Sequence, residues 1–175
     1  YLVFGKTTTE QVAIPDIEAG QGGYAIWGRA GINYAPLEVA WAGDVNGDGL
    51  DDLLIGASGV RSYFNIVPSA SYVVFGKPNP EPVDLSAVAK GEGGFVIREA
   101  DQREGGFGAH VSGAGDVNGD GFADLIIGAP LAPGEKENAG SSYVVFGKTT
   151  TEAVELSAIV AGQGGFVING VHADD

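Results

Sequence analysis

The sequence predicts an all-β fold made of β-propeller blades, each a sheet of four short antiparallel strands. One unit recurs along the chain at a step of 71 residues. Within a unit, short β-branched and aromatic runs alternate with clusters of Gly, Pro and Asp, a pattern typical of strands and tight turns. No apolar pattern with the periodicity and length of a helix appears, so nothing in the sequence would cover a sheet face except a neighbouring sheet. Propeller blades are covered in this way.

The repeat is visible in two marker segments. Tyr1–Lys6 (YLVFGK) returns almost unchanged as Tyr72–Lys77 and Tyr143–Lys148, and Gly20–Ile26 returns as Gly91–Ile97 and Gly162–Ile168. A fixed period of this size indicates a repeat architecture before any local assignment is made. A ten-stranded β-sandwich is the alternative that the length permits, but a sandwich does not require one meander to recur at a fixed step.

Each full unit contains four expected strands, which we label A to D in chain order. In the first full unit they are 37–42, 52–57, 71–75 and 95–98, and in the second they are 107–113, 123–129, 142–146 and 166–169. The chain opens with strands C and D only. We therefore expect a half blade at 1–32, a blade at 33–103 and a blade at 104–175, which together are fewer than the 4 to 8 blades that close a propeller.

Composition narrows the range of partners. The net charge of −14, from 23 acidic and 9 basic residues, argues against nucleic acid or an anionic membrane surface and favours cations. There is no cysteine, which excludes disulfides and thiolate metal sites. No stretch is apolar enough for a membrane span. The chain begins on a strand-like segment without Met, which suggests a processed chain or an excised piece.

Two acidic loops join strand A to strand B, one in each full unit. Both place oxygen-bearing side chains at positions 1, 3, 5 and 9, and position 7 would contribute its backbone carbonyl. Ca²⁺ takes 6 to 8 oxygen ligands, and glycines at positions 4 and 6 allow the backbone to wrap closely around an ion. The expected ligands are Asp44, Asn46, Asp48, Leu50 and Asp52 in the first loop, and Asp116, Asn118, Asp120, Phe122 and Asp124 in the second.

The spacing separates these loops from an EF-hand, which needs an acidic residue at position 12. That position holds Ile55 in one loop and Ile127 in the other. The alternative is that Asp, Asn and Gly only form turns, but both copies retain every oxygen position. Asp51 is replaced by Ala123 in the second copy and is left out of the ligand set. Mg²⁺ fits less well because it prefers a strict octahedral site that keeps several waters. We expect two Ca²⁺ ions whose removal lowers the melting temperature.

These residues resemble the FG-GAP repeat of integrin α-subunits and of many bacterial surface proteins. Phe107–Gly108 and Gly128–Pro130 spell out the motif on either side of the second acidic loop. The resemblance implies a seven-bladed propeller in the intact protein, Ca²⁺ sites on its lower face and a role in extracellular adhesion or assembly. The first full unit departs from the motif, with Ala35–Pro36 in place of Phe-Gly and Ser58 in place of Pro. That departure puts the packing of its strand A in doubt.

The loops on the opposite face are the candidate partner surface. In the first full unit they carry an aromatic and arginine set typical of binding hot spots, namely Trp27, Arg29, Tyr34, Arg61, Tyr63 and Phe64. In the second unit the same loops carry mostly charged residues. The aromatic side chains could instead pack on one another as a small loop core. The expected partners are a protein or glycan on this face, and also further blades or other copies of the chain.

Nothing in the sequence indicates catalysis. The two histidines, His110 and His172, share no motif, and the Asp nearest to His110 and Ser112 is Asp116, already assigned to calcium. The sequence therefore predicts a non-enzymatic, secreted or cell-surface propeller module that acts as an adhesion or assembly scaffold. A carbohydrate-binding module and the non-catalytic propeller of a secreted hydrolase are the alternatives.

Overall fold

The computed structural model describes residues 1–28, 37–62, 65–99, 106–132 and 139–172, apart from the side chains of residues 37 and 60–67. Its elements in chain order are β1 (Leu2–Val3), α1 (Ile14–Glu18), β2 (Gly23–Tyr24), β3 (Ile26–Trp27), β4 (Leu37–Gly43), β5 (Asp52–Ala57), β6 (Val60–Ser62), β7 (Asn65–Val67), β8 (Ala70–Val74), β9 (Val83–Asp84), α2 (Leu85–Val88), β10 (Gly94–Arg98), β11 (His110–Gly115), β12 (Asp124–Ala129), β13 (Ser141–Val145), β14 (Val154–Glu155), α3 (Leu156–Val160) and β15 (Gly165–Asn169).

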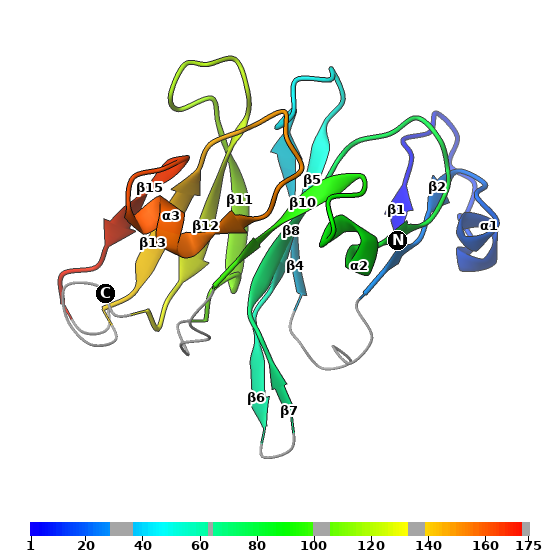
Figure 1. Cartoon of the computed structure of the whole chain (residues 1–175). Helices are drawn as coiled ribbons and strands as arrows, with labels where there is room; N and C mark the ends of the chain where they lie inside the picture. The colour runs from blue at the N-terminus through cyan, green and yellow to red at the C-terminus, as the bar shows by residue number, and fades with distance from the viewer. Residues whose placement is uncertain (29–36, 63–64, 100–105, 133–138, 173–175) are drawn as a thin grey trace.

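Two four-stranded antiparallel meanders form the centre of the molecule (Figure 1). The first full blade is ordered β4-β5-β8-β10, and the second full blade is ordered β11-β12-β13-β15. Strands β1, β2 and β3 lie beyond the first full blade. In the repeat, β1 corresponds to strand C, and β2 and β3 together correspond to strand D. The predicted all-β fold of propeller blades is confirmed.

Most expected strands occur within a few residues of their predicted limits, but the FG segment does not. Phe107 and Gly108 form a turn, and β11 begins at His110. Gly106 and Gly108 have φ values of 64° and 78°, the left-handed region that favours glycine, and Ala109 N–H donates to Gly106 O at 3.0 Å. In the other blade Ala35 and Pro36 lie outside the described residues, and β4 pairs with β5 along its length.

Three helices of four or five residues in the described part of the chain were not predicted. Each lies between strands C and D, and each is too short to show a helical period in the sequence. In α2 the Asp84 side chain accepts a hydrogen bond from Ser86 N–H at 2.7 Å, an ordinary helix N-cap. The hairpin of β6 and β7 was also missed, and it extends the connection from strand B to strand C.

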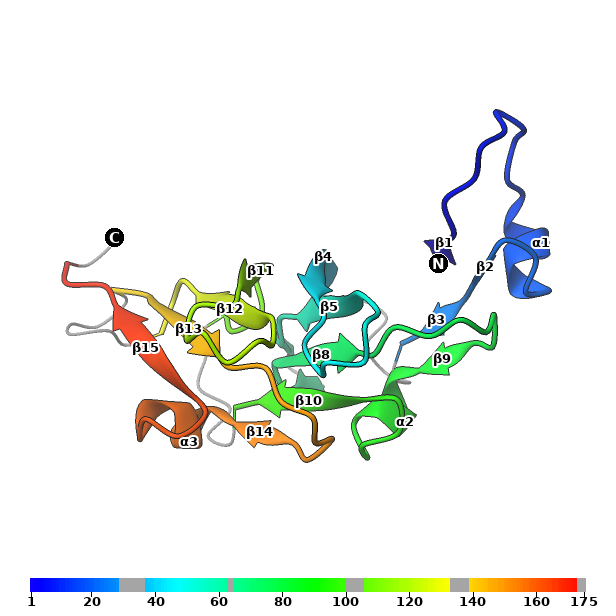
Figure 2. The same cartoon turned by 90° about the horizontal axis from the view of Figure 1, so that it is seen from above.

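Short parallel strands join each blade to the one before it (Figure 2). β9 pairs with β3 through Ile26 and Val83, and β14 pairs with β10 through Ile97 and Val154. In both cases the two-residue segment before the helix of one unit adds an outer strand to strand D of the preceding unit. This connection between strands C and D, which we call the clasp, therefore adds an edge strand to the preceding blade.

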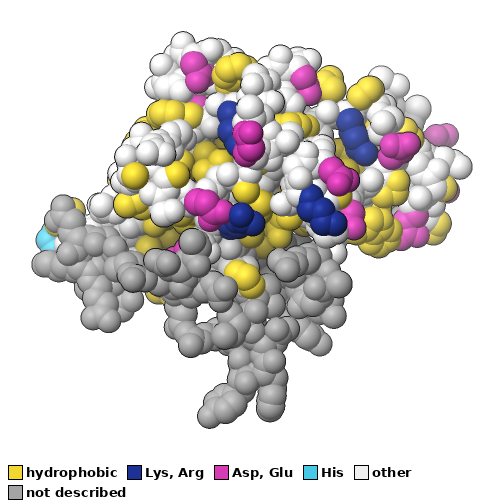
Figure 3. Space-filling model, viewed as in Figure 1, with side chains coloured by type: hydrophobic (Ala, Val, Ile, Leu, Met, Phe, Trp, Pro, Cys, Tyr) yellow, Lys and Arg dark blue, Asp and Glu magenta, His cyan; other side chains and the backbone are white. Residues whose placement is uncertain are grey.

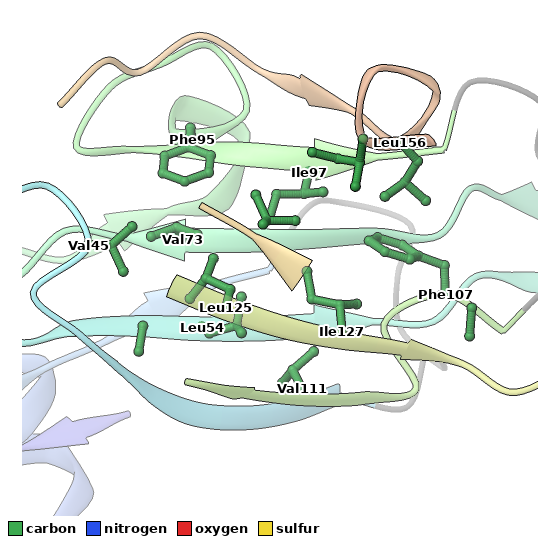
Figure 4. Packing of buried hydrophobic residues seen from close by; sticks show 14 of the residues in the cluster. Val45, Leu54, Val73, Phe95, Ile97, Phe107, Val111, Leu125, Ile127 and Leu156 are labelled. Carbon is green, nitrogen blue, oxygen red and sulfur yellow. The ribbon is translucent and has the colours of Figure 1, made fainter. Parts of the chain in front are cut away.

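The main core lies between the two full blades (Figure 4). Leu54, Val73 and Phe95 of the first full blade face Leu125 and Ile127 of the second, and all five are fully or almost fully buried. A second cluster covers the other face of the first full blade and includes Leu53, Ile55, Tyr72, Val74, Leu85 and Val88, with Ile26 packed against it. Because β5, β8 and most of β10 are buried on both faces, these strands read as continuous apolar runs, whereas Val39 and Trp41 of β4 are exposed.

The loops between strands A and B lie on one side of the molecule, at the top of Figure 1. The β6–β7 hairpin, which connects strands B and C, projects from the opposite side. The acidic loops and the β6–β7 hairpin therefore lie on opposite sides of the molecule.

Candidate functional site

The two acidic loops close the hairpins β4–β5 and β11–β12. A register shift between Trp41 and Gly43, repeated between Gly113 and Gly115, ends regular pairing just before each loop. Glycines at positions 4 and 6 of both loops have φ between 78° and 94°. The chain can therefore turn back on itself within a few residues.

Asp44 organises the first loop. Its Oδ1 accepts hydrogen bonds from Gly47 N–H at 2.7 Å and Asp48 N–H at 3.0 Å, and its Oδ2 accepts from Gly49 N–H at 2.9 Å. Asn46 Oδ1 accepts from Asp48 N–H at 2.8 Å, and Asn46 Nδ2 donates to Asp48 Oδ2 at 2.9 Å. The side chains at positions 1, 3 and 5 are thus connected in one network.

Asp52, at position 9, has no solvent exposure. Its Oδ2 accepts from Val45 N–H at 2.9 Å and its Oδ1 from Gly76 N–H at 2.7 Å, so it ties the loop to the end of strand C. Burial raises the pKa of the Asp52 carboxyl to about 6, against the opposing effect of the Gly76 and Val45 N–H donors, and the nearby charges of Asp48 and Asp44 raise it further.

The second loop repeats this arrangement bond for bond. Asp116 accepts from the N–H groups of Gly119, Asp120 and Gly121 at 2.7 to 3.1 Å. Asp124 is fully buried and accepts from Val117 N–H and Gly147 N–H, each at 2.8 Å. Two segments 72 residues apart have therefore reached the same geometry.

The donor chemistry of each loop suits a hard cation, because every side chain at positions 1, 3, 5 and 9 offers oxygen. In the described part of the chain, however, no three Asp, Glu, His or Cys side chains lie close enough together to hold a metal ion. The carboxylates accept backbone N–H groups instead. Since an ionised carboxylate has about four lone-pair sites, these bonds leave acceptor capacity for an ion.

The first loop also packs against the second full blade. Asp44 O accepts from Ala123 N–H and Val45 O accepts from Lys148 N–H, both at 2.9 Å. Val45 is consequently fully buried, whereas its counterpart Val117 is 50 % exposed. The first loop therefore contributes to the contact between blades.

The sequence did not predict the roles of Gly76 and Gly147, whose N–H groups hold the position 9 carboxylates. A Cβ on Gly147 would lie 2.5 Å from Phe122 Cβ and 2.7 Å from Ala123 O, so no side chain fits there. The signal was present in the repeated Phe-Gly-Lys, where this glycine recurs at the end of strand C.

Of the candidate partner residues, Trp27 is described and is 50 % exposed at the end of β3. Arg61 lies on β6, where only the backbone is described. The remaining four, Arg29, Tyr34, Tyr63 and Phe64, lie outside the described residues. Figure 3 shows acidic and basic side chains interspersed with hydrophobic ones over the described part of the visible face.

His110 and Ser112 do not form a catalytic pair. His110 Nδ1 lies 3.3 Å from Glu38 Oε2 on the adjacent blade, and Ser112 Oγ donates to Gly113 O at 3.0 Å. Both side chains are exposed on β11. Among the described helices, none has the length and apolar character needed to cross a membrane.

Comparison with known proteins agrees with the repeat. The FG-GAP repeat model matches residues 37–72 and 107–145. Integrin alpha-PS2 of Drosophila melanogaster is 33 % identical over 122 residues, which cover 67 % of this chain and 8 % of the integrin. The phosphatidylinositol-glycan-specific phospholipase D of Rattus norvegicus is 30 % identical over 144 residues, 81 % of this chain and 16 % of that enzyme.

A shorter stretch is more similar. Integrin alpha-X of Mus musculus is 54 % identical over 41 residues, 23 % of this chain and 3 % of the integrin. The chain thus spans a small part of the length of each of these relatives. With the two matched repeats and the blades described above, the chain is an FG-GAP, integrin-α-like propeller module.

Proposed function

We propose that this chain is a calcium-binding, extracellular propeller module that acts as a scaffold for adhesion or assembly and is not itself an enzyme. The observation that carries the proposal is the duplicated loop, in which two segments of the chain present the same oxygen donors in the same backbone geometry. Each of these side-chain oxygens accepts a hydrogen bond from the chain and keeps acceptor capacity for an ion.

Calcium would be held by Asp44, Asn46, Asp48, Asp52 and the Leu50 carbonyl, and in the second loop by the equivalent five residues. The ion would offset the mutual repulsion of three carboxylates in each loop and join strand A to strand B. Binding of this kind stabilises the folded chain, by about 2.7 kcal/mol per site at a free concentration of 100 Kd. For a chain of this size, that corresponds to a rise of roughly 5–10 °C in melting temperature per site.

Thermal unfolding in calcium and in chelator tests the proposal. The wild-type chain should melt at a higher temperature in calcium, and Asp48→Asn or Asp120→Asn should each lose about half of that rise. Asn preserves the side-chain shape and the acceptor for the backbone N–H at position 7, so the calcium-dependent part of the melt is the informative quantity. The double variant should not respond to calcium.

Asp51→Asn is the matched control. It removes the same charge beside Asp52, but Asp51 is exposed and its counterpart in the second loop is Ala123. This control should respond to calcium as the wild type does. An unchanged wild-type melt on chelation, or a full response in the double variant, would refute calcium binding by these loops.

The partner surface is proposed on the side opposite the acidic loops, where Trp27 is exposed. Binding of the Trp27→Ala and Tyr63→Ser/Phe64→Ser variants to extracellular protein and glycan panels would test it. Loss of protein binding with an unchanged melt supports the scaffold, whereas selective loss of glycan binding supports a carbohydrate-binding module.

A second candidate is the accessory propeller of a secreted hydrolase. It is favoured by the similarity to the rat phospholipase D, which covers 81 % of this chain. A full-length transcript that encodes a hydrolase domain with this segment would support it, and the calcium-dependent melt would be the same in either case.

A further inference from the structure

We propose that the two acidic loops are coupled, so that calcium bound in the second loop raises the affinity of the first loop for calcium, and the reverse. The proposal rests on the calcium binding proposed above and concerns how one site regulates the other. Its basis is a set of contacts between the two loops, which meet where the two full blades pack together (Figure 1).

The backbone of the first loop is hydrogen-bonded to the second loop. Asp44 O accepts from Ala123 N–H at 2.9 Å. Asp44 stands at position 1 of the first loop, and Ala123 stands between Phe122 and Asp124, two expected ligands of the second loop. The first ligand of one site is therefore held by a residue that lies between two ligands of the other.

The Phe122 side chain makes a second contact between the loops. A Cβ on Gly47 would lie 2.4 Å from Phe122 Cε1, so the ring packs directly against the backbone of the first loop. A Cβ on Gly43 would likewise lie 2.8 Å from Ala123 Cβ. Because the Phe122 carbonyl is an expected ligand of the second loop, this one residue contacts the first loop and belongs to the second.

The segment after strand C of the second full blade makes a third contact, and it holds both loops at once. Gly147 N–H donates to Asp124 Oδ1 at 2.8 Å, and Lys148 N–H donates to Val45 O at 2.9 Å. A Cβ on Gly147 would lie 2.5 Å from Phe122 Cβ and 2.9 Å from Val45 O. Two successive peptide groups therefore fix position 9 of the second loop and position 2 of the first.

This connection is tightly packed and therefore able to transmit a change. Lys148 Nζ lies 4.5 Å from the centroid of the Phe95 ring and donates to Glu152 O. Val45 is fully buried in the same core cluster as Phe95 and Leu125 (Figure 4). Because packed contacts of this kind resist gradual deformation, the first loop cannot move without disturbing its contact with the second.

The contacts also determine the sign of the coupling. An ion in the second loop would fix Asp124 and the Phe122 carbonyl, and with them Ala123, which donates to Asp44 O. The first loop would then have less conformational freedom to lose when it binds its own ion, which gives positive cooperativity. The effect is reciprocal, since a coupling between two binding sites acts equally in both directions.

Nuclear magnetic resonance on the isotope-labelled chain measures the calcium midpoint of each loop separately. The reporters are backbone amides that donate to the aspartate at position 1, namely Gly47 and Gly49 in the first loop and Gly119 and Gly121 in the second. The titration is made at about 0.15 M salt, where the screening length of about 8 Å limits repulsion between the two ions.

Variants that remove one carboxylate from one loop test the coupling. In Asp120→Asn, which impairs the second loop, the midpoint of the first loop should rise by about tenfold, a typical size for coupled sites. Asp48→Asn should raise the midpoint of the second loop by a similar factor. Thermal melts in chelator establish that both variants fold. If Asp120→Asn does not, Asp120→Ser replaces it, since its hydroxyl keeps an acceptor for Phe122 N–H.

Two outcomes separate this proposal from the function on which it rests. An equal midpoint of the first loop in the wild type and in Asp120→Asn, with both wild-type loops responding to calcium, would overturn the coupling and leave calcium binding intact. Absence of any calcium response in both loops of the wild type would overturn calcium binding and the coupling together.

Val45→Ala and Val117→Ala test the route of the coupling. Val45 is fully buried where the loops meet, its counterpart Val117 is 50 % exposed, and neither belongs to the expected ligand set. Adding Asp120→Asn to Val45→Ala should shift the midpoint of the first loop by clearly less than it does in the wild type. Adding it to Val117→Ala should give the wild-type shift. An undiminished shift in the Val45→Ala background would contradict coupling through this contact.

Discussion

The residue that links the acidic loop to the fold is the aspartate at position 9. Asp52 and Asp124 are buried, and each accepts one N–H group from its own loop and one from the glycine after strand C. Spacing in the sequence identified both residues as oxygen donors. Their second task, holding strand B against the end of strand C, depends on a partner 23 or 24 residues away, which local spacing does not reveal.

The pKa of Asp52 gives a pH prediction at this scale. In chelator its carboxyl should titrate near pH 6, because burial disfavours the charged form. A pKa raised in the folded state means that Asp52 contributes its full stability below its ordinary pKa of about 4 and loses it as pH rises through about 6. The proposed calcium ion would bind the carboxylate form of Asp52, so the rise in melting temperature with calcium should be larger at pH 7 than at pH 5.

Carbon-detected NMR of aspartate side chains measures this titration directly. The Asp52 carboxyl carbon should shift near pH 6 in chelator and at a clearly lower pH in calcium. A midpoint that is the same in both conditions would mean that calcium does not contact this carboxylate.

At the scale of elements, the strands were predictable and the clasps between blades were not. Strands A to D can be recognised in the sequence as apolar runs between turns, as in β5 and β12. The clasp consists of a two-residue strand and a helix of at most five residues. Segments this short show neither the helical period of about 3.6 residues nor the alternation of a strand. The FG turn was misplaced because Phe107, although apolar and buried, belongs to a glycine turn rather than to the strand.

The stability of a clasp should come from its apolar helix and not from its ion pair. Leu156, the first residue of α3, is 5 % exposed, so Leu156→Ala should reduce the free energy of unfolding by about 2–5 kcal/mol. Arg98 Nε lies 2.6 Å from Glu155 Oε1, but both side chains are substantially exposed, and Arg98→Ala should cost less than about 1 kcal/mol. Urea denaturation measures both, and a larger loss for Arg98→Ala would reverse this ranking.

At the scale of the whole molecule, neighbouring blades decide which equivalent residues are buried. Sequence repetition predicted that the two loops are alike, and their internal hydrogen bonds confirm it. It could not predict that only the first loop is covered by a following blade in the described structure. That difference depends on the position of a unit in the array, which identical motifs do not encode.

Val45 and Val117 form a matched pair for this effect. Val45→Ala removes a fully buried side chain at the contact between blades and should lower the free energy of unfolding by about 1–3 kcal/mol. Val117→Ala changes a side chain that is 50 % exposed and should stay within about 0.5 kcal/mol of the wild type at concentrations where the chain is monomeric. Equal losses in denaturant titrations would show that the first loop does not contribute to the blade contact.

The central claim is that both acidic loops bind calcium through oxygen. A high-resolution crystal structure grown in calcium tests it most directly. We predict one ion in each loop, with Asp44, Asp48 and Asp52 around the first and Asp116, Asp120 and Asp124 around the second, at distances of about 2.3–2.6 Å. Density for water alone at both positions in a calcium-rich buffer would contradict the claim.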